Sequence, residues 1–429
     1  MKVSIMTLGC KVNQYESEAM AELFTNSGYE VVNDEISDIY IINTCTVTNL
    51  SDRKSRQFIS RAKTENPEAI IAVVGCYSQI SPEDIEKIGD IDIILGTTDR
   101  CRIVELCELA MRDKVQINLV KKLEPGKDFE PLEITENSDK TRSYIKVQEG
   151  CNQFCTYCII PYARGPITSR DMDSVISEAT VLAENGYKEV VLTGIHVASY
   201  GLDHGKSEAL IELIEGVDKI PGIERIRMSS LEPNIITRPF MERISKLDKF
   251  CDHFHLSLQS GSDNVLKRMN RKYNSEDYTK KIELIREYYP DAGITTDIIV
   301  GFPGESDEDF KDSLKMVNDI GFSRVHAFRY SPRTGTPAAK FKDQIHGEIK
   351  KDRSNTLIEL ADRKSEEFLD SLIGKKLKIL FETKAGNVVE GYSTNYVKVG
   401  VNSGEDLEGQ IKTVIIEERR EDLLLGKLL

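Results

Sequence analysis

Short apolar runs alternate with helical patterns through the first part of the chain. Four of these runs are expected to be strands, at residues 3–7, 38–42, 70–74 and 91–95. Strands that alternate with amphipathic helices predict a parallel sheet with helices on its faces. Residues 1–112 are therefore expected to form an open parallel α/β sheet.

The same alternation returns after a stretch that has no periodicity. Residues 113–142 carry Pro125-Gly126, Pro131 and mixed charges, a composition typical of a linker. Six further strands are expected at 144–147, 189–192, 225–229, 253–257, 295–300 and 324–328, separated by helical patterns such as 173–185, 275–289 and 307–319. Six βα units fall short of the eight in a closed barrel. Residues 143–368 are expected to form a partial (βα)6 barrel, whose opening can admit a macromolecule.

The end of the chain changes to short strands and tight turns. The expected strands are 377–381, 388–392, 396–399 and 411–416, with turns at Gly386-Asn387, Asn395 and Ser403-Gly404. A closed barrel leaves no edge strand exposed. Residues 370–429 are therefore expected to form a small all-β barrel.

Charge and hydropathy exclude several classes of protein. With 57 basic and 71 acidic residues the net charge is -14, which argues against a general nucleic-acid coat because such affinity comes from Lys and Arg. No apolar run approaches the ~18 residues of a membrane helix, and no signal peptide is visible. The nine cysteines are then metal ligands or core residues rather than disulfides. We expect a cytoplasmic protein that needs local basic groups if it binds RNA.

Three cysteines lie close together at the start of the central unit. They are Cys151, Cys155 and Cys158, and the next cysteine is Cys251. Thiolates packed this densely suit iron or zinc. A [4Fe-4S] cluster held by three cysteines keeps one iron open for another ligand, which suits catalysis. A zinc knuckle is the alternative, but it normally has a second cysteine pair within about 20 residues.

A second set of cysteines follows the first three expected strands. Cys10, Cys45 and Cys76 each come directly after such a strand. Because the carboxyl ends of parallel strands share one edge, these thiols are expected to converge into another three-cysteine cluster site. The alternative for each is an ordinary buried thiol, which is what we expect of Cys101, Cys107 and Cys251.

A basic helix is expected beside that edge. Ser51 or Asp52 can cap it, and helical spacing brings Arg53, Arg56 and Lys63 near one face. Such a patch is a plausible phosphate contact. A solvated helix face is the alternative interpretation.

The cysteine run continues as Ile159-Ile160-Pro161-Tyr162-Ala163-Arg164-Gly165, and the pattern CxxxCx(aromatic)C resembles the cluster motif of radical S-adenosylmethionine (SAM) enzymes. The terminal module resembles the TRAM domain, an RNA-binding barrel. Together with the first cysteine set, this order resembles the radical SAM methylthiotransferases over essentially the whole chain.

That resemblance implies two [4Fe-4S] clusters and SAM as cofactors. Cys151, Cys155 and Cys158 would hold the cluster that binds SAM, and Cys10, Cys45 and Cys76 an auxiliary cluster that carries the inserted sulfur. The implied SAM contacts are Tyr157, Gly194, Gln259, Asp297 and Gly301. His253 and His255 share a strand face and are expected to be core or lining residues, with metal ligands as the alternative, and the role of His196 is open.

The run from Thr7 to Ser17, TLGCKVNQYES, resembles the branch of the family that acts on N6-threonylcarbamoyladenosine at position 37 of tRNA. The implied reaction adds a methylthio group at C2 of that base. The implied partners are a tRNA anticodon loop and a flavodoxin- or ferredoxin-like electron donor, with no membrane and no DNA. The alternatives are the branches that act on isopentenyladenosine or on a ribosomal protein, and a non-catalytic iron-sulfur protein that binds RNA.

Overall fold

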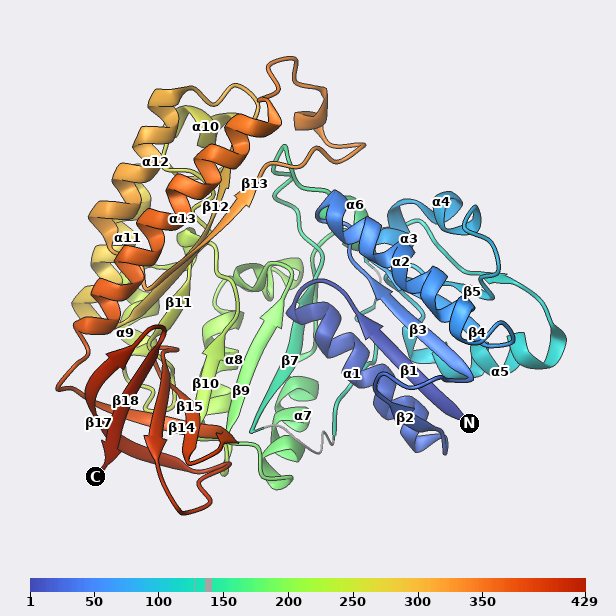
Figure 1. Ribbon diagram of the computed structural model, residues 1–429, viewed down its shortest axis with the longest axis horizontal. Helices are drawn as coiled ribbons and strands as arrows, with labels where there is room; N and C mark the ends of the chain where they lie inside the picture. Colours follow the sequence, from blue (N-terminus) through green and yellow to red (C-terminus); the bar gives the residue numbers. More distant parts are fainter. Residues whose placement is uncertain (127, 136–140) are drawn as a thin grey trace.

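The computed structural model describes residues 1–126, 128–135 and 141–429, and it consists of two α/β units and a terminal β barrel (Figure 1). Within those residues, the first unit is a parallel sheet of order β2-β1-β3-β4-β5-β6. Its strands are β1 (Lys2–Thr7), β2 (Glu30–Val32), β3 (Ile39–Thr44), β4 (Ile70–Gly75), β5 (Ile93–Ile94) and β6 (Ile117–Asn118). Its helices are α1 (Lys11–Asn26), α2 (Asn49–Glu65), α3 (Cys76–Ile80), α4 (Pro82–Glu86) and α5 (Ile103–Asp113).

Alternate residues of the central strands face opposite sides of this sheet. Ile39 and Ile41 pack into the core on the side of α1 and α5, whereas Tyr40 and Ile42 pack with Ile59 of α2. The expected open parallel sheet is therefore confirmed. The short strands β2 and β6 were not expected, and β6 lies in the segment that the sequence indicated as a linker.

The second unit has six parallel strands that carry the larger core. They are β7 (Arg142–Glu149), β9 (Glu189–Gly194), β10 (Arg225–Met228), β11 (His253–His255), β12 (Gly293–Val300) and β13 (Arg324–Arg329). A two-residue strand, β8 (Thr168–Ser169), pairs antiparallel with β7. Two isolated β-bridges, Ile226–Phe250 and Leu231–Leu256, connect the segment around β10 with the segment around β11. The expected partial barrel is present.

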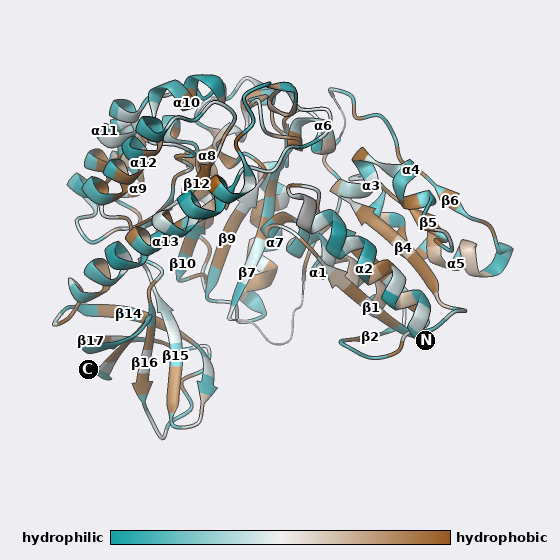
Figure 2. Cartoon of the chain, turned by 45° about the horizontal axis from the view of Figure 1, so that its top comes forward, coloured by the Kyte–Doolittle hydropathy of each residue, from teal (hydrophilic) through white to brown (hydrophobic). Residues whose placement is uncertain are grey.

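Helices cover the outer side of these strands. They are α7 (Met172–Glu184), α8 (Ala209–Asp218), α9 (Arg238–Ile244), α10 (Asp263–Arg268), α11 (Ser275–Tyr288), α12 (Asp307–Ile320) and α13 (Gly347–Asp370), whereas α6 (Ile160–Arg164) lies against α3 of the first unit. Ile294 and Ile298 of β12 belong to the core with these helices, so Thr295 and Asp297 between them face the inside of the partial barrel. Figure 2 shows strands β4, β9 and β10 as mostly hydrophobic between more hydrophilic helices.

The last unit is a closed barrel in the order β14-β15-β16-β18-β17. Its strands are β14 (Lys376–Ala385), β15 (Val388–Ser393), β16 (Lys398–Asn402), β17 (Ile411–Arg420) and β18 (Leu423–Leu428). The barrel was expected, but β18 was not. Gly426 lies in the middle of β18 because a β-carbon there would come within 2.3 Å of the Ile415 carbonyl oxygen.

The β barrel covers the amino ends of the central strands (Figure 1). Arg225 begins β10 and donates from Nη1 to the carbonyl of Tyr392 at 2.7 Å. Arg227 donates to the carbonyls of Ser393 and Thr394 and pairs with Glu189 at 2.7 Å. The carboxyl ends of the strands, where a barrel builds its site, lie at the other end. None of the helices in the described residues is long and apolar enough to cross a membrane.

Candidate active site

The structure brings Cys10, Cys45 and Cys76 together at the carboxyl edge of the first sheet. They follow β1, β3 and β4, which are neighbours in the sheet. A β-carbon on Gly9 would lie 3.2 Å from Cys45 Sγ, so the loop before Cys10 packs directly on Cys45. Gly9 has φ 119° and Gly75 has φ 101°, values that favour glycine.

These thiols are costly to ionise without a metal. Burial raises the pKa of Cys76 to about 12, a shift that Arg164 opposes and the neighbouring Cys45 and Cys10 reinforce. The pKa of Cys45 is raised for the same reasons. The structure pairs none of the nine cysteines in disulfides, and all nine lie among its described residues. Three close thiols at one sheet edge fit a metal cluster, because a bound metal replaces the protons.

The second set lies in the loop between β7 and α6. The Cys158 amide donates to the Cys155 carbonyl at 2.9 Å, and the Gln153 amide donates to Cys151 Sγ at 3.4 Å, so the loop wraps around the thiols. Burial raises the pKa of Cys151 to about 11 and that of Cys158 to about 12. A β-carbon on Gly150 would lie 1.9 Å from the Pro166 carbonyl oxygen, so only glycine fits at the entrance to this loop. This set also fits a three-cysteine cluster.

One arginine stands beside each cysteine set. Arg271 Nη1 lies 3.2 Å from Cys155 Sγ, and Arg164 Nε lies 3.1 Å from Cys76 Sγ. Local sequence patterns did not indicate this role for either arginine. They lie 116 and 88 positions from their cysteines, and no local spacing connects such distant residues.

A buried network of charges joins the two α/β units. Arg164 Nη1 lies 2.5 Å from Glu16, and Lys146 lies 2.8 Å from Glu16 and 2.5 Å from Glu149. Arg100 lies 2.5 Å from the other oxygen of Glu16. Burial alone would raise the pKa of Glu149, but Arg164 and Lys146 lower it to about 2. The network therefore stays ionised. Through Arg164, which contacts both Glu16 and Cys76, it holds the first cysteine set against the central unit.

The expected SAM contacts Gly194, Gln259 and Gly301 lie at the carboxyl side of the central strands. Gly194 ends β9, and a β-carbon there would come within 2.9 Å of the Gln148 carbonyl oxygen. Gln259 has φ 69°, and its amide donates to the Asp297 carbonyl at 2.8 Å. Gly301 also has φ 69°, and its amide donates to Glu305 at 2.6 Å.

The other two expected contacts, Tyr157 and Asp297, adjoin these turns. The Tyr157 ring meets Phe302 edge-on at 6.5 Å. Asp297 lies within β12, and its carboxylate is 3.3 Å from His255 Nε2. His253, as expected, lines the inside of the partial barrel, where its Nε2 lies 3.2 Å from Thr295 Oγ1.

His196 lies near the second cysteine set and could form hydrogen bonds with a ligand there. Both of its ring nitrogens are buried and have no hydrogen-bond partner among the described residues. Burial and then Arg271 lower its pKa to about 4, so the ring is neutral near pH 7. Its Nε2 lies 3.9 Å from Glu232, which pairs with Arg271 at 2.7 Å. Unpartnered buried polar atoms next to three thiols that fit a cluster also fit a polar ligand such as the amino-acid part of SAM.

The basic helix α2 differs in part from the expectation. Its cap is Thr48, whose hydroxyl accepts from the Ser51 amide at 3.2 Å, so the expected cap at Ser51 or Asp52 was wrong. Asp52 instead pairs with Arg333 at 2.6 Å. Among the expected phosphate contacts, Arg53 is exposed, Lys63 is half-buried, and Arg56 donates to the Tyr77 hydroxyl at 2.9 Å.

The remaining cysteines lie apart from both sets. Cys107 belongs to the core of the first sheet and Cys251 is fully buried, as expected. Cys101 is half-buried and packs at the edge of the larger core.

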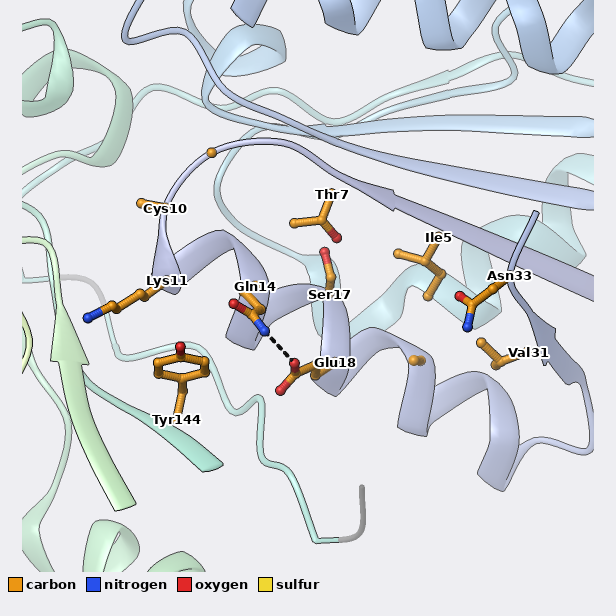
Figure 3. A pocket seen from close by; sticks show the side chains of 12 residues that line it. Ile5, Thr7, Cys10, Lys11, Gln14, Ser17, Glu18, Val31, Asn33 and Tyr144 are labelled. Carbon is orange, nitrogen blue, oxygen red and sulfur yellow. Dashed lines mark hydrogen bonds between the residues drawn. The ribbon is translucent and has the colours of Figure 1, made fainter. Parts of the chain in front are cut away.

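A cavity of about 660 Å³ opens beside Cys10, along β1, α1 and β2, with Tyr144 of β7 also in its lining (Figure 3). Cys10, Lys11, Gln14 and Tyr144 line part of it. Burial and then Arg227 and Arg142 lower the pKa of Lys11 to about 8.

On the inside of the partial barrel, one ligand atom each from His255, Asp297 and His326 lies within 4.8 Å of the others. The sequence predicted His255 as a core or lining residue and Asp297 as a SAM contact, but it did not indicate that His326 joins them.

Two family models match the chain. Residues 145–317 match the radical SAM superfamily, and residues 2–96 match the uncharacterized protein family UPF0004. The chain is 42% identical to a threonylcarbamoyladenosine tRNA methylthiotransferase MtaB of Bacillus subtilis, over 96% of this chain and 93% of that protein. It is 39% identical to the protein of the same name in Thermotoga maritima, over 99% and 98%.

A relative with another substrate is also similar. A tRNA-2-methylthio-N(6)-dimethylallyladenosine synthase of Acetivibrio thermocellus is 41% identical over 88% of this chain and 79% of that protein. Among solved structures, the radical SAM methyltransferase TsrM of Kitasatospora setae matches with a TM-score of 0.56 at 15% identity, over 79% of this chain and 77% of that one. The likeness to TsrM concerns the fold alone.

Proposed function

Because this chain belongs to the radical SAM methylthiotransferase family, we propose that it methylthiolates C2 of N6-threonylcarbamoyladenosine at position 37 of tRNA. The observation that carries the proposal is the presence of two separate sets of three close cysteines, one following the first sheet's strands and one in the loop after β7. The names of the relatives in Bacillus subtilis and Thermotoga maritima support the base. The dimethylallyladenosine relative supports the second candidate substrate, isopentenyladenosine at the same position.

The cofactors of the enzyme are SAM and two [4Fe-4S] clusters. Cys151, Cys155 and Cys158 would hold the cluster that binds SAM, and Cys10, Cys45 and Cys76 would hold the other. When bound, these groups would supply a radical that can remove hydrogen from the unactivated C2 of adenine, the sulfur that replaces it and, from a second SAM, the methyl group on that sulfur.

The side chains around the cofactors have defined tasks in this proposal. Arg271 and Arg164 donate N–H groups to cysteine sulfurs, which stabilises negative charge on those ligands. The neutral ring of His196 and the Glu232 carboxylate offer polar atoms to the amino-acid part of SAM. Tyr157, Gly194, Gln259, Asp297 and Gly301 would complete the SAM site.

The proposed substrate also requires residues that bind RNA. A base in an anticodon loop can be splayed out without melting a duplex. Arg53, Arg56 and Lys63 of α2 would contact phosphates, since α2 begins four residues after Cys45. The residues 370–429 would add a second contact with the RNA.

A flavodoxin- or ferredoxin-like protein would supply electrons, and a tRNA substrate would place the enzyme in the cytoplasm. The units would be 1–112, 143–368 and 370–429, with 113–142 linking the first two.

The proposal is tested by weighing tRNA nucleosides from cells with and without this gene. The expected result is loss of 2-methylthio-N6-threonylcarbamoyladenosine and a gain of its precursor, restored by the intact gene and not by the Cys151→Ala variant. Loss of the isopentenyl product instead would favour the second candidate. Unchanged nucleosides would overturn both.

A further inference from the structure

The cavity beside Cys10 contains a cation, Lys11, whose acidic neighbours Glu189 and Asp297 act on it electrostatically but form no ion pair with it among the described residues. Lys11 is the first residue of α1 and lines the cavity with Cys10 and Tyr144. Figure 3 shows its side chain extending from the start of the helix towards the strands of the central unit. The residue is half-buried, and it forms no hydrogen bond or ion pair with any residue that the structure describes.

The neighbouring cations are already satisfied. Arg142 pairs with Glu382 at 2.9 Å, and Arg227 pairs with Glu189 at 2.7 Å. Arg225 donates to backbone carbonyls. A partly buried ammonium group without a direct partner is costly, and the repulsion of two nearby arginines is only partly offset by Glu189 and Asp297. An anionic ligand at Lys11 would remove that cost.

Polar side chains continue from Lys11 into the partial barrel. Asp297 and His326 are close enough for electrostatic interaction with Lys11. His255 Nδ1 lies 2.9 Å from Thr295 Oγ1 on the same inner surface. This lining offers hydrogen-bond donors and acceptors that an apolar substituent would leave unpaired. A substituent with one carboxylate, a hydroxyl and a urea group matches it.

We propose that Lys11 binds the carboxylate of the threonylcarbamoyl group and is a specificity-determining residue of the enzyme. This inference rests on the proposed function. Because Lys11 directly follows Cys10, the same segment would position the base and the proposed auxiliary cluster. A base without the carboxylate would leave the ammonium group unpaired, and the enzyme would discriminate against it.

A double-mutant cycle between protein and substrate tests the pair directly. The substrates are an anticodon stem-loop with threonylcarbamoyladenosine and the same stem-loop with that carboxylate esterified by a methyl group. In the wild-type enzyme, esterification should reduce kcat/KM on the order of 10- to 100-fold, the range for a lost hydrogen bond to a charged group. The Lys11→Met variant should show a similar loss with the free acid and no further loss with the ester.

Controls separate this effect from damage to the cluster. Lys87→Met removes an exposed lysine of the same unit, which is paired with Asp84, and should leave both rates unchanged. Iron content and reductive SAM cleavage should stay at the wild-type level in Lys11→Met. Lys11→Gln repeats the comparison with a polar side chain if methionine lowers the iron content.

The outcomes distinguish the two claims. A wild-type enzyme that does not methylthiolate the free-acid stem-loop overturns the proposed function. An active wild-type enzyme that treats acid and ester alike overturns the carboxylate contact. A Lys11→Met variant that still discriminates as strongly as the wild type overturns the assignment to Lys11 and leaves the proposed function intact.

Discussion

Arg164 donates from Nε to the sulfur of Cys76 over 3.1 Å, although the two residues lie 88 positions apart. Arg164 ends the helix that follows the Cys151 loop, and Cys76 begins the helix that follows β4. The same guanidinium group also binds Glu16 at 2.5 Å and Asn13 at 2.6 Å. One buried side chain therefore fixes the position of one cysteine set relative to the other.

The first prediction concerns this contact. Arg164→Lys keeps the positive charge but loses the planar group that reaches both Glu16 and the sulfur. We expect the reduction potential of the auxiliary cluster to fall, since hydrogen bonds to sulfur stabilise the reduced state. A difference of ~1 kcal/mol in that bond corresponds to about 40 mV for one electron. The measurement is a redox titration followed by electron paramagnetic resonance.

Arg271→Lys is the matched control, because Arg271 occupies the same position beside Cys155. Its effect should fall on the cluster that binds SAM and leave the auxiliary potential unchanged. Equal shifts of both potentials in both variants would contradict local tuning by these arginines.

The second prediction concerns cluster content. Two sets of three cysteines predict about eight irons per chain, four for each cluster. Anaerobic reconstitution of the Cys151→Ala, Cys155→Ala, Cys158→Ala variant should give roughly half of that iron and no SAM cleavage. The Cys10→Ala, Cys45→Ala, Cys76→Ala variant should also give half but still cleave SAM. Full iron content in the first variant, or methylthiolated product from the second, would refute the assignments.

The third prediction concerns the docking of the β barrel. Burial alone would raise the pKa of Glu189, but Arg227 and Arg142 lower it from 4.5 to about 2. A depressed carboxylate pKa stabilises the fold above the unfolded value, and this stability is lost as the pH falls from about 4.5 towards 2. Glu189→Gln should therefore lower the free energy of unfolding on the order of 3 kcal/mol at pH 7. Urea unfolding of the metal-free protein measures it.

The difference between wild type and Glu189→Gln should shrink below pH 4.5. Glu224→Gln is the control, because Glu224 forms an exposed pair with Lys188. Such pairs contribute at most about 1 kcal/mol. A Glu189→Gln variant as stable as this control at pH 7 would show that the buried pairs do not hold the barrel.

The fourth prediction concerns the contact of α2 with RNA. Each lost phosphate contact should reduce the salt slope of tRNA binding by about one. Arg53→Ala should show this reduction, because Arg53 is exposed. Arg61→Ala is the control on the same helix, since Arg61 pairs with Glu65 at 2.6 Å. An equal slope for Arg53→Ala and the wild type, measured from 50 to 200 mM salt, would make this face an ordinary solvated one.

Sequence patterns predicted the parts of the fold that rest on continuous local signals. The strand of Ile70–Gly75 is buried along its whole length and stands out as an apolar run. The strand of Ile117–Asn118 has two residues, too few for any period, and the strand of Leu423–Leu428 contains a glycine that weakens its pattern. The sequence also predicted that Cys10, Cys45 and Cys76 meet at one edge of the sheet, because the carboxyl ends of parallel strands share an edge.

Contacts between distant residues could not be read from the sequence. Asp52 has a side chain and a position typical of a helix cap. Its carboxylate instead accepts a hydrogen bond from Arg333, which lies 281 residues away in the sequence. Arg271 has no local motif, and only the folded barrel brings it to Cys155. The polar group around His255 and Asp297 likewise depends on the registry of three strands.

The most direct test of the proposed function is a competition between two modified tRNAs. Purified enzyme with both clusters, SAM and a reductant is offered equal amounts of tRNA with threonylcarbamoyladenosine and tRNA with isopentenyladenosine, and the digested nucleosides are weighed. A site that pairs polar groups of the substrate discriminates against bases without them by about 10⁴ or more. We therefore predict 2-methylthio-N6-threonylcarbamoyladenosine as the sole product, and methylthiolation confined to the isopentenyl tRNA would contradict the account.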